Sequence, residues 1–210
     1  MTVTEAGRST ITIRRPTAPR PEPVKAPTFK LGGPVAGRTI GLRTDGAWRS
    51  WVLIAGAWDA LLREAGAETL SVETNAQVGS EGRHDRDNIA EWSDQIDGGI
   101  VGLGTCGSCT SFSVHDAVTL EAHSKPSVVV VTSEFETHAR NMASFLGHGD
   151  LEVLVLPYPL EARPDGELRE IAVEYYPRAL ELLGATERSE RAAARTVRPS
   201  EGDHEVGAGR

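Results

Sequence analysis

Short apolar runs alternate with helix-like segments through the middle of this chain, and this alternation constrains its fold more than any other feature. The runs are GRTIGLRT, ETLSVET, GGIVGLGT, SVVVVTS and LEVLVLPYP, between residues 37 and 159. Each is followed by a segment with helical spacing of its apolar residues. This order is typical of a mostly parallel sheet with helices on both faces. We therefore predict a three-layer α/β domain with a sheet of about five strands.

The connecting segments predict five helices. They are expected at residues 47–67, 85–96, 110–124, 134–147 and 167–184. Gly79 and Gly82 predict a polar loop before the second helix. Pro126 prevents the third helix from running further, and Pro177 is expected to bend or interrupt the last one.

The two ends of the chain differ in composition from its middle. Residues 1–34 are rich in proline, threonine and basic side chains and have no apolar periodicity, which predicts a flexible arm. Residues 187–210 are polar and contain several glycines, which predicts a second flexible tail. Residues 35–186 are left as a single domain. The arm either docks on an acidic partner or is simply solvated.

Charge and hydropathy narrow the classes of function. The 210 residues carry a formal net charge of −8, which argues against a nucleic-acid-binding protein. No stretch approaches the roughly 20 apolar residues of a membrane span. The N-terminal segment also lacks the apolar run that a secretory signal peptide needs. We therefore expect a cytoplasmic protein whose partner is a small-molecule substrate, and homo-oligomerisation is left open.

Both cysteines of the chain lie in one short motif, CGSC. Cys106 and Cys109 directly follow the third apolar run, at the sheet edge where open α/β proteins bind ligands. A helix that begins near residue 108 would stabilise a thiolate at Cys106 and lower its pKa. Cys109, three residues later, can reach back to the first sulfur. We predict that Cys106 attacks a substrate and that Cys109 resolves the intermediate.

Other residues at the same edge are candidates for substrate binding or proton transfer. His115 and Asp116 are the proton-transfer candidates, although both are up to two helical turns from the sulfurs. The predicted substrate-binding residues are Asp45, Trp48, Arg49, Gly104, Thr105, Gly107, Ser108, Thr110 and Glu134. Arg49 and the adjacent helix N-terminus would suit a carboxylate or phosphate. The alternative is a capped helix with Trp48 and Trp51 packed in the core.

Two other interpretations of the CGSC motif stay open. A zinc site would have to recruit further ligands such as His84, His115 or His138, none of which has a diagnostic spacing. The cysteines could also be small packing residues. The run GLGTCG has the spacing G-x-G-x-x-G at Gly102, Gly104 and Gly107, but this short match alone does not establish a dinucleotide-binding motif. We therefore predict neither a metal nor a cofactor.

The segment GLGTCGSCTSFSVHDAVTLEAHSKPSVVVVTSEF resembles the UGSC family of selenoproteins and their cysteine homologues. The family's motif is selenocysteine-Gly-Ser-Cys, so Cys106 stands at the selenocysteine position and Cys109 at that of its partner. The likeness extends to RTDGAWRSW and VLPYP, and the motif is more distantly similar to that of glycine and proline reductase subunits. The resemblance implies thiol or selenol redox chemistry without defining a substrate.

These observations predict a thiol-dependent oxidoreductase that acts on a small molecule. The cysteine pair would end each turnover as a disulfide, which a thiol or a protein reductase then reduces. One alternative is a non-redox lyase or transferase in which Cys106 alone acts. The other is a non-enzymatic redox-sensing subunit.

Overall fold

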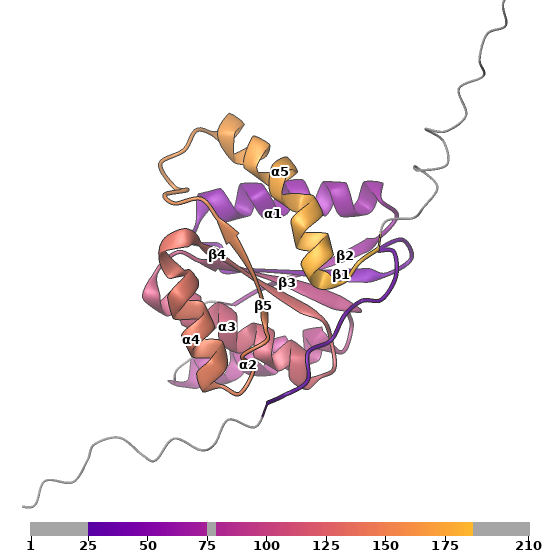
Figure 1. The fold of residues 1–210 in the computed structure, drawn as a ribbon, viewed down its shortest axis with the longest axis vertical. Coiled ribbons are helices and arrows are strands. Elements are labelled where there is room, and N and C mark those ends of the chain that lie inside the picture. Colours follow the sequence, from indigo (N-terminus) through magenta and orange to yellow (C-terminus); the bar gives the residue numbers. More distant parts are fainter. Residues whose placement is uncertain (1–24, 75–78, 187–210) are drawn as a thin grey trace, which may run out of the picture.

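The computed structural model describes residues 25–74 and 79–186, which form a five-stranded parallel sheet between two layers of helices (Figure 1). The strands are β1 (Thr39–Thr44), β2 (Glu68–Glu73), β3 (Gly98–Gly104), β4 (Ser127–Thr132) and β5 (Glu152–Leu156). The helices are α1 (Arg49–Glu64), α2 (Gly79–Ser93), α3 (Gly107–Ala122), the 3-10 turn η1 (Ser133–Phe135), α4 (Glu136–Phe145) and α5 (Asp165–Leu183). The predicted three-layer α/β fold is confirmed.

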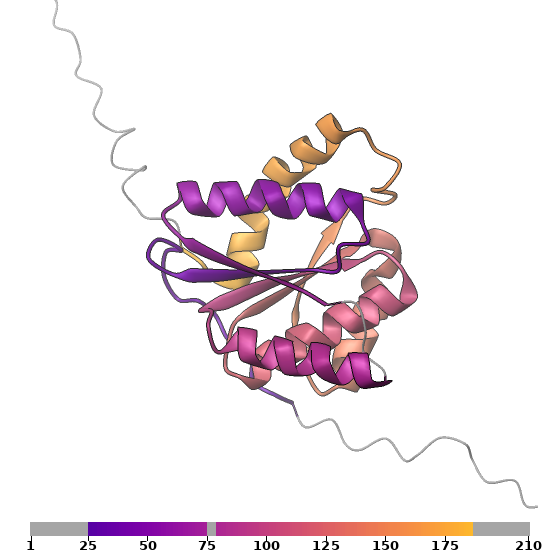
Figure 2. The same cartoon turned by 180° about the vertical axis from the view of Figure 1, so that it is seen from behind.

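Two apolar cores lie on opposite faces of the sheet. Helices α1 and α5 cover one face, and α2, α3 and α4 cover the other (Figures 1 and 2). Alternate residues of β4 enter different cores: Val128 and Val130 pack with α1 and α5, whereas Val129 and Val131 pack with α2, α3 and α4. A strand buried on both faces has to be apolar throughout, which explains the run of four valines.

The strands lie in the order β2-β1-β3-β4-β5. This is the flavodoxin-like order of doubly wound sheets, in which the chain reverses direction across the sheet between β1 and β3. The connections after these two strands lead to helices on opposite faces of the sheet, and proteins of this class bind ligands at the carboxyl edge between them. The loop after β3 carries the two cysteines.

The N-terminal boundary of the domain differs from the sequence prediction. Residues 25–33, which we call the N-terminal strap, lie along the amino edge of the sheet. Leu31 N donates to Leu183 O (2.9 Å) and Gly32 N to Gly184 O (3.0 Å), so the strap supplies partners for the end of α5. Leu31 is also buried in the core. The part of the predicted arm from residue 25 onward is therefore ordered, whereas residues 1–24 and 187–210 lie outside the described residues.

Helices α2 and α5 also differ from what the sequence predicts. Helix α2 includes Gly79 and Gly82, although a loop was expected there, because helix propensity is a weak preference that tertiary contacts override. Helix α5 continues through Pro177 without interruption. Val173, whose carbonyl loses its amide partner to Pro177, is exposed, and water can bind that carbonyl.

None of the helices in the described part of the chain is long and apolar enough to cross a membrane.

Candidate functional site

The cysteine pair lies where β3 passes into α3. Cys106 is the N-cap residue of α3, and its Sγ accepts a hydrogen bond from Cys109 N at 3.1 Å. The two Cα atoms are 5.3 Å apart and the sulfurs are joined as a disulfide. Helix α3 begins at Gly107, close to the start near residue 108 that the sequence predicts, and the sulfur of Cys106 takes the place of an ordinary capping oxygen.

The two sulfurs have different surroundings. Besides the amide of Cys109, Cys106 Sγ has the Ser108 hydroxyl 3.4 Å away. Cys109 Sγ instead accepts a hydrogen bond from the indole Nε1 of Trp48, also at 3.4 Å, which comes from the loop after β1. Trp48 is partly buried against the core. The first sulfur therefore lies against the start of its own helix, and the second lies against a side chain of the neighbouring loop.

The turn between the cysteines is open to solvent. Gly107 and Ser108 are exposed. A Cβ atom built on Gly107 would meet no other atom within 4 Å. A molecule can therefore approach this turn from solvent without moving any part of the described structure.

A tight contact fixes the end of β3 beneath the pair. A Cβ atom on Gly104 would lie 2.7 Å from Val131 Cγ1 and 2.9 Å from Thr110 Oγ1. Thr110 is fully buried, and its hydroxyl donates to Cys106 O at 2.6 Å. Thr105 lies between Gly104 and Cys106 in the chain, and its hydroxyl is 3.4 Å from that of Thr132. Gly104 and Thr110 thus hold the turn in place, whereas both had been predicted to bind substrate.

A buried ion pair, which was not predicted from the sequence, supports the same strand. The Arg43 guanidinium lies 2.8 Å from Asp116 Oδ2, and both side chains are almost completely buried. Arg43 Nη1 donates to Gly102 O at 2.9 Å, and Thr74 Oγ1 donates to Asp116 at 3.0 Å. Asp116, predicted as a proton-transfer group, instead binds a guanidinium inside the domain. The sequence signal that could have revealed this ion pair is Arg43, a charged residue in the otherwise uncharged strand β1.

His115, the other proton-transfer candidate, lies on the exposed side of α3. Neighbouring residues of a helix point about 100° apart, so His115 can face solvent although Asp116 beside it is buried. Its backbone lies about 9 Å along the helix axis from that of Cys109, at 1.5 Å per residue. Its carbonyl accepts a hydrogen bond from Thr119 Oγ1 at 3.1 Å.

A different histidine, His138, contacts the CGSC turn. Its Nε2 lies 3.0 Å from Ser111 Oγ and 3.2 Å from Gly107 O. A carbonyl oxygen only accepts, so Nε2 carries the proton in this arrangement. The sequence had indicated His138 as a potential zinc ligand, and its place after β4, at the same edge of the sheet, is the signal that puts it near the CGSC turn. Glu134, predicted at the same edge, is exposed in η1.

The predicted anion site at the start of α1 is filled by the protein itself. Glu161 Oε1 accepts hydrogen bonds from Ser50 N (2.8 Å) and Ser50 Oγ (2.6 Å). Arg49 forms an ion pair with Asp165 and donates to Arg163 O. A carboxylate is stabilised at a helix N-terminus, and here the loop between β5 and α5 supplies it. Arg49 is therefore engaged by that loop and by Asp165, and a role for it in substrate binding stays a prediction.

Asp45, another predicted binding residue, is a buried carboxyl at the end of β1. Its Oδ1 accepts a hydrogen bond from Ala47 N at 3.1 Å. Burial raises the pKa of Asp45 above its ordinary value of 3.8, while the Ala47 amide and the charge of Arg43 act against this rise. The side chain can therefore hold a proton at a higher pH than an exposed aspartate can.

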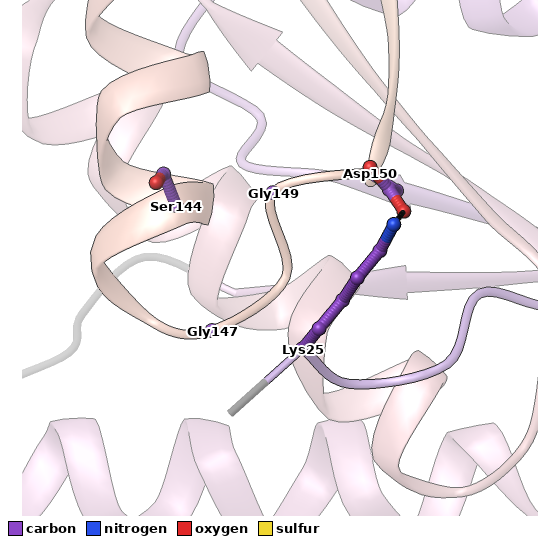
Figure 3. A pocket seen from close by; sticks show the side chains of 5 residues that line it. All are labelled: Lys25, Ser144, Gly147, Gly149 and Asp150. Carbon is purple, nitrogen blue, oxygen red and sulfur yellow. Dashed lines mark ion pairs between the residues drawn. The ribbon is translucent and has the colours of Figure 1, made fainter. Parts of the chain in front are cut away.

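A shallow pocket lies at the opposite edge of the sheet (Figure 3). It is lined by Lys25, Ser144, Gly147, Gly149 and Asp150. Lys25 comes from the strap and pairs with Asp150 in the loop before β5, at 2.7 Å. Because this loop precedes a strand, the pocket is at the amino edge and is separate from the cysteines. Within residues 25–74 and 79–186, no three histidine, cysteine or acidic side chains are grouped so that they could hold a metal ion.

The strand order and the position of the motif define a doubly wound α/β protein with a cysteine pair at its switch point. The chain belongs to the UGSC family, whose model matches residues 12–185. This confirms the family that the CGSC motif and its flanking residues indicated.

Two solved structures have a distant likeness to the fold. A diflavin flavoprotein A3 from Nostoc sp. is 14% identical with a TM-score of 0.45, and the match covers 76% of this chain and 99% of that one. A ribose 5-phosphate isomerase from Thermotoga maritima is 19% identical with a TM-score of 0.32, and covers 76% and 97%. None of the curated proteins matches the chain. Neither structure is similar enough to bear on activity.

Proposed function

We propose that this protein is a thiol-dependent oxidoreductase that reduces a small molecule through Cys106 and Cys109. The observation that carries the proposal is the bonded cysteine pair at the N-terminus of α3, at the switch point of the sheet. Two sulfurs in bonding contact can exchange electrons with a substrate in pairs. Their position in this fold class is where ligands bind.

The surroundings of the two sulfurs support different roles for them. Cys106 receives the Cys109 amide, lies beside the Ser108 hydroxyl and adjoins the exposed turn at Gly107. Donors and a helix N-terminus favour the thiolate, which is the nucleophilic form of cysteine. Cys109 is contacted by Trp48 on the side toward the β1 loop. We therefore assign Cys106 as the nucleophile and Cys109 as the resolving thiol.

The proposed cycle transfers two electrons to the substrate. The Cys106 thiolate attacks an oxidised substrate X–Y at X, so that an S–X bond forms and Y leaves with the bonding pair and takes up a proton. Cys109, as a thiolate, attacks Cys106 Sγ, which forms the disulfide and releases X as its protonated reduced form. Two equivalents of a thiol, or one dithiol protein of a reducing compartment such as the cytoplasm, then restore the cysteines.

The test uses glutathione disulfide as the oxidised probe and mass spectrometry as the readout. The reduced wild-type protein should release two equivalents of glutathione and gain the Cys106–Cys109 disulfide. Cys109→Ser should keep one glutathione on Cys106, since it lacks the resolving thiol. Cys106→Ser is the matched control and should react much more slowly.

Two outcomes would overturn the proposal. One is a glutathione adduct that forms on Cys109 at the same rate whether or not Cys106 is present. The other is a wild-type protein that retains its adduct and forms no disulfide, which would favour a non-redox reaction at Cys106 alone.

A further inference from the structure

The indole of Trp48 is the one side chain from another loop that donates a described hydrogen bond to either sulfur. Its Nε1 lies 3.4 Å from Cys109 Sγ, across a separation of 61 residues. The other described donors, the amide of Cys109 and the hydroxyl of Ser108, belong to the CGSC segment and are directed at Cys106. The hydrogen bond from Trp48 therefore distinguishes Cys109 from Cys106.

The position of Trp48 is fixed by contacts on both sides of it. Its carbonyl accepts from Val52 N at 3.0 Å as α1 begins. The next two residues are tied to the segment that leads into α5: Glu161 binds Ser50, and Asp165, the first residue of α5, binds Arg49. The indole packs against the apolar core. Trp48 therefore presents its N–H from a preorganised position, with little ordering still to be done when charge develops on the sulfur.

We propose that Trp48 is a catalytic residue that stabilises Cys109 as the leaving thiolate when the disulfide is opened. The inference rests on the proposed function, because it concerns the step that reduces the cysteine pair. A reductant thiolate attacks Cys106 Sγ, the S–S bond breaks, and its electron pair goes to Cys109 Sγ. The indole keeps its proton and donates a hydrogen bond, and the Cys109 thiolate later takes a proton from solvent.

The effect follows from the change in the acceptor. A disulfide sulfur is neutral and accepts weakly, whereas a thiolate carries a full charge, and hydrogen bonds to charged groups are roughly twice as strong as neutral ones. The bond from Trp48 therefore strengthens as the disulfide opens. It lowers the barrier for attack at Cys106 and has no such effect on attack at Cys109, where Cys106 would be the leaving group.

The first test compares Trp48→Phe with wild type in the reduction of the disulfide by dithiothreitol. Loss of the donor should slow the reaction about tenfold, the effect of about one charge-assisted hydrogen bond. Trp92→Phe is the matched control, because the Trp92 indole donates to Leu70 O of β2 at 3.0 Å and not to a sulfur. It should reduce at the wild-type rate.

The second test does not depend on any redox cycle. In a Cys106→Ser background, the alkylation rate of Cys109 by iodoacetamide is followed against pH with and without Trp48→Phe. Removing the indole should move the midpoint of this profile upward by about one pH unit. An unchanged midpoint and an unchanged reduction rate would overturn the role of Trp48.

If Trp48→Phe does not fold, the indole resonance of Trp48 gives the answer in the Cys106→Ser protein. Its ¹⁵N–¹H signal should titrate with Cys109, while that of Trp92 should not; a Trp48 signal insensitive to that titration would overturn the proposal. A normal Trp48 effect together with no turnover of glutathione disulfide would count against the proposed function alone.

Discussion

The two edges of the sheet are built in opposite ways. At the amino edge, the N-terminal strap crosses the ends of three helices: Ala26 N donates to Gly147 O, Phe29 N to Glu121 Oε2 and Leu31 N to Leu183 O. At the carboxyl edge, the turn at Gly107 and Ser108 is exposed and has two sulfurs beside it. One edge uses its polar groups to close the domain, and the other leaves reactive atoms within reach of solvent.

The carboxyl edge nevertheless has support below its surface. Arg43 and Asp116 hold Gly102, and Gly104 lets Thr110 pack closely beneath Cys106. Close packing directly beneath the exposed turn therefore holds it in place. The buried ion pair can be compared with the exposed ion pair at the amino edge. Gly104 can be compared with Gly107, where an added Cβ would meet no other atom.

The largest expected effect is a loss of stability when the buried ion pair at the carboxyl edge is broken. The Arg43 and Asp116 side chains are 1% and 2% exposed, whereas those of Lys25 and Asp150 are 76% and 53% exposed. Asp116→Asn should lower the free energy of unfolding by about 3 kcal/mol, because it leaves a buried guanidinium without its counter-ion. Asp150→Asn, the matched change at the amino edge, should leave it unchanged within error.

Urea unfolding followed by circular dichroism measures both variants. Equal losses for the two substitutions would mean that the buried pair contributes no more than the exposed one. That result would contradict a rigidly supported carboxyl edge.

A smaller effect is expected within the CGSC turn itself. Gly104→Ala places a Cβ against Val131 and Thr110 and should lower stability by about 1–3 kcal/mol, as overpacking does. It should also slow the alkylation of Cys106, since the start of α3 has to shift. Gly107→Ala points into open space and should unfold at the wild-type urea concentration. The interpretation fails if Gly107→Ala is the more damaging of the two.

The smallest effect is a pH dependence at Asp45. The folded state raises the pKa of Asp45 above 3.8 through burial, so the folded protein binds this proton more tightly than the unfolded chain does. The stability that Asp45 contributes is therefore complete below about pH 4 and is lost as pH rises through the raised folded-state pKa. Asp45→Asn keeps the acceptor for Ala47 N but cannot ionise.

The stability difference between wild type and Asp45→Asn should therefore shift in favour of the variant as pH rises through this window. Glu121, whose pKa burial also raises, titrates in both proteins and drops out of the difference. A difference that moves toward the wild type with rising pH would contradict the raised pKa of Asp45. Urea midpoints measured from about pH 3 to pH 7 provide the comparison.

The layers and the edge that carries the motif were predictable from the sequence because they depend on local patterns. Apolar runs such as that of β4 identify buried strands, and the strand-to-helix turn after β3 places Cys106 at a helix start. The i, i+3 spacing was sufficient to predict that the two sulfurs can meet.

Contacts between distant segments were not predictable in the same way. The pairing of Arg43 with Asp116 spans 73 positions of the numbering, and that of Trp48 with Cys109 spans 61. Neither pair has a local spacing that marks it. The N-terminal strap was likewise missed because it has no apolar period, and its backbone is ordered by the helix ends that it covers.

The most direct test of the central claim is the relative reactivity of the two cysteines in the reduced wild-type protein. A limiting amount of iodoacetamide is added near pH 7, and peptide mass spectrometry measures how much of each sulfur is alkylated with time. We predict that Cys106 is alkylated several-fold faster than Cys109, because it lies at the helix N-terminus beside the exposed turn. Faster alkylation of Cys109, or equal rates for the two sulfurs, would contradict this claim.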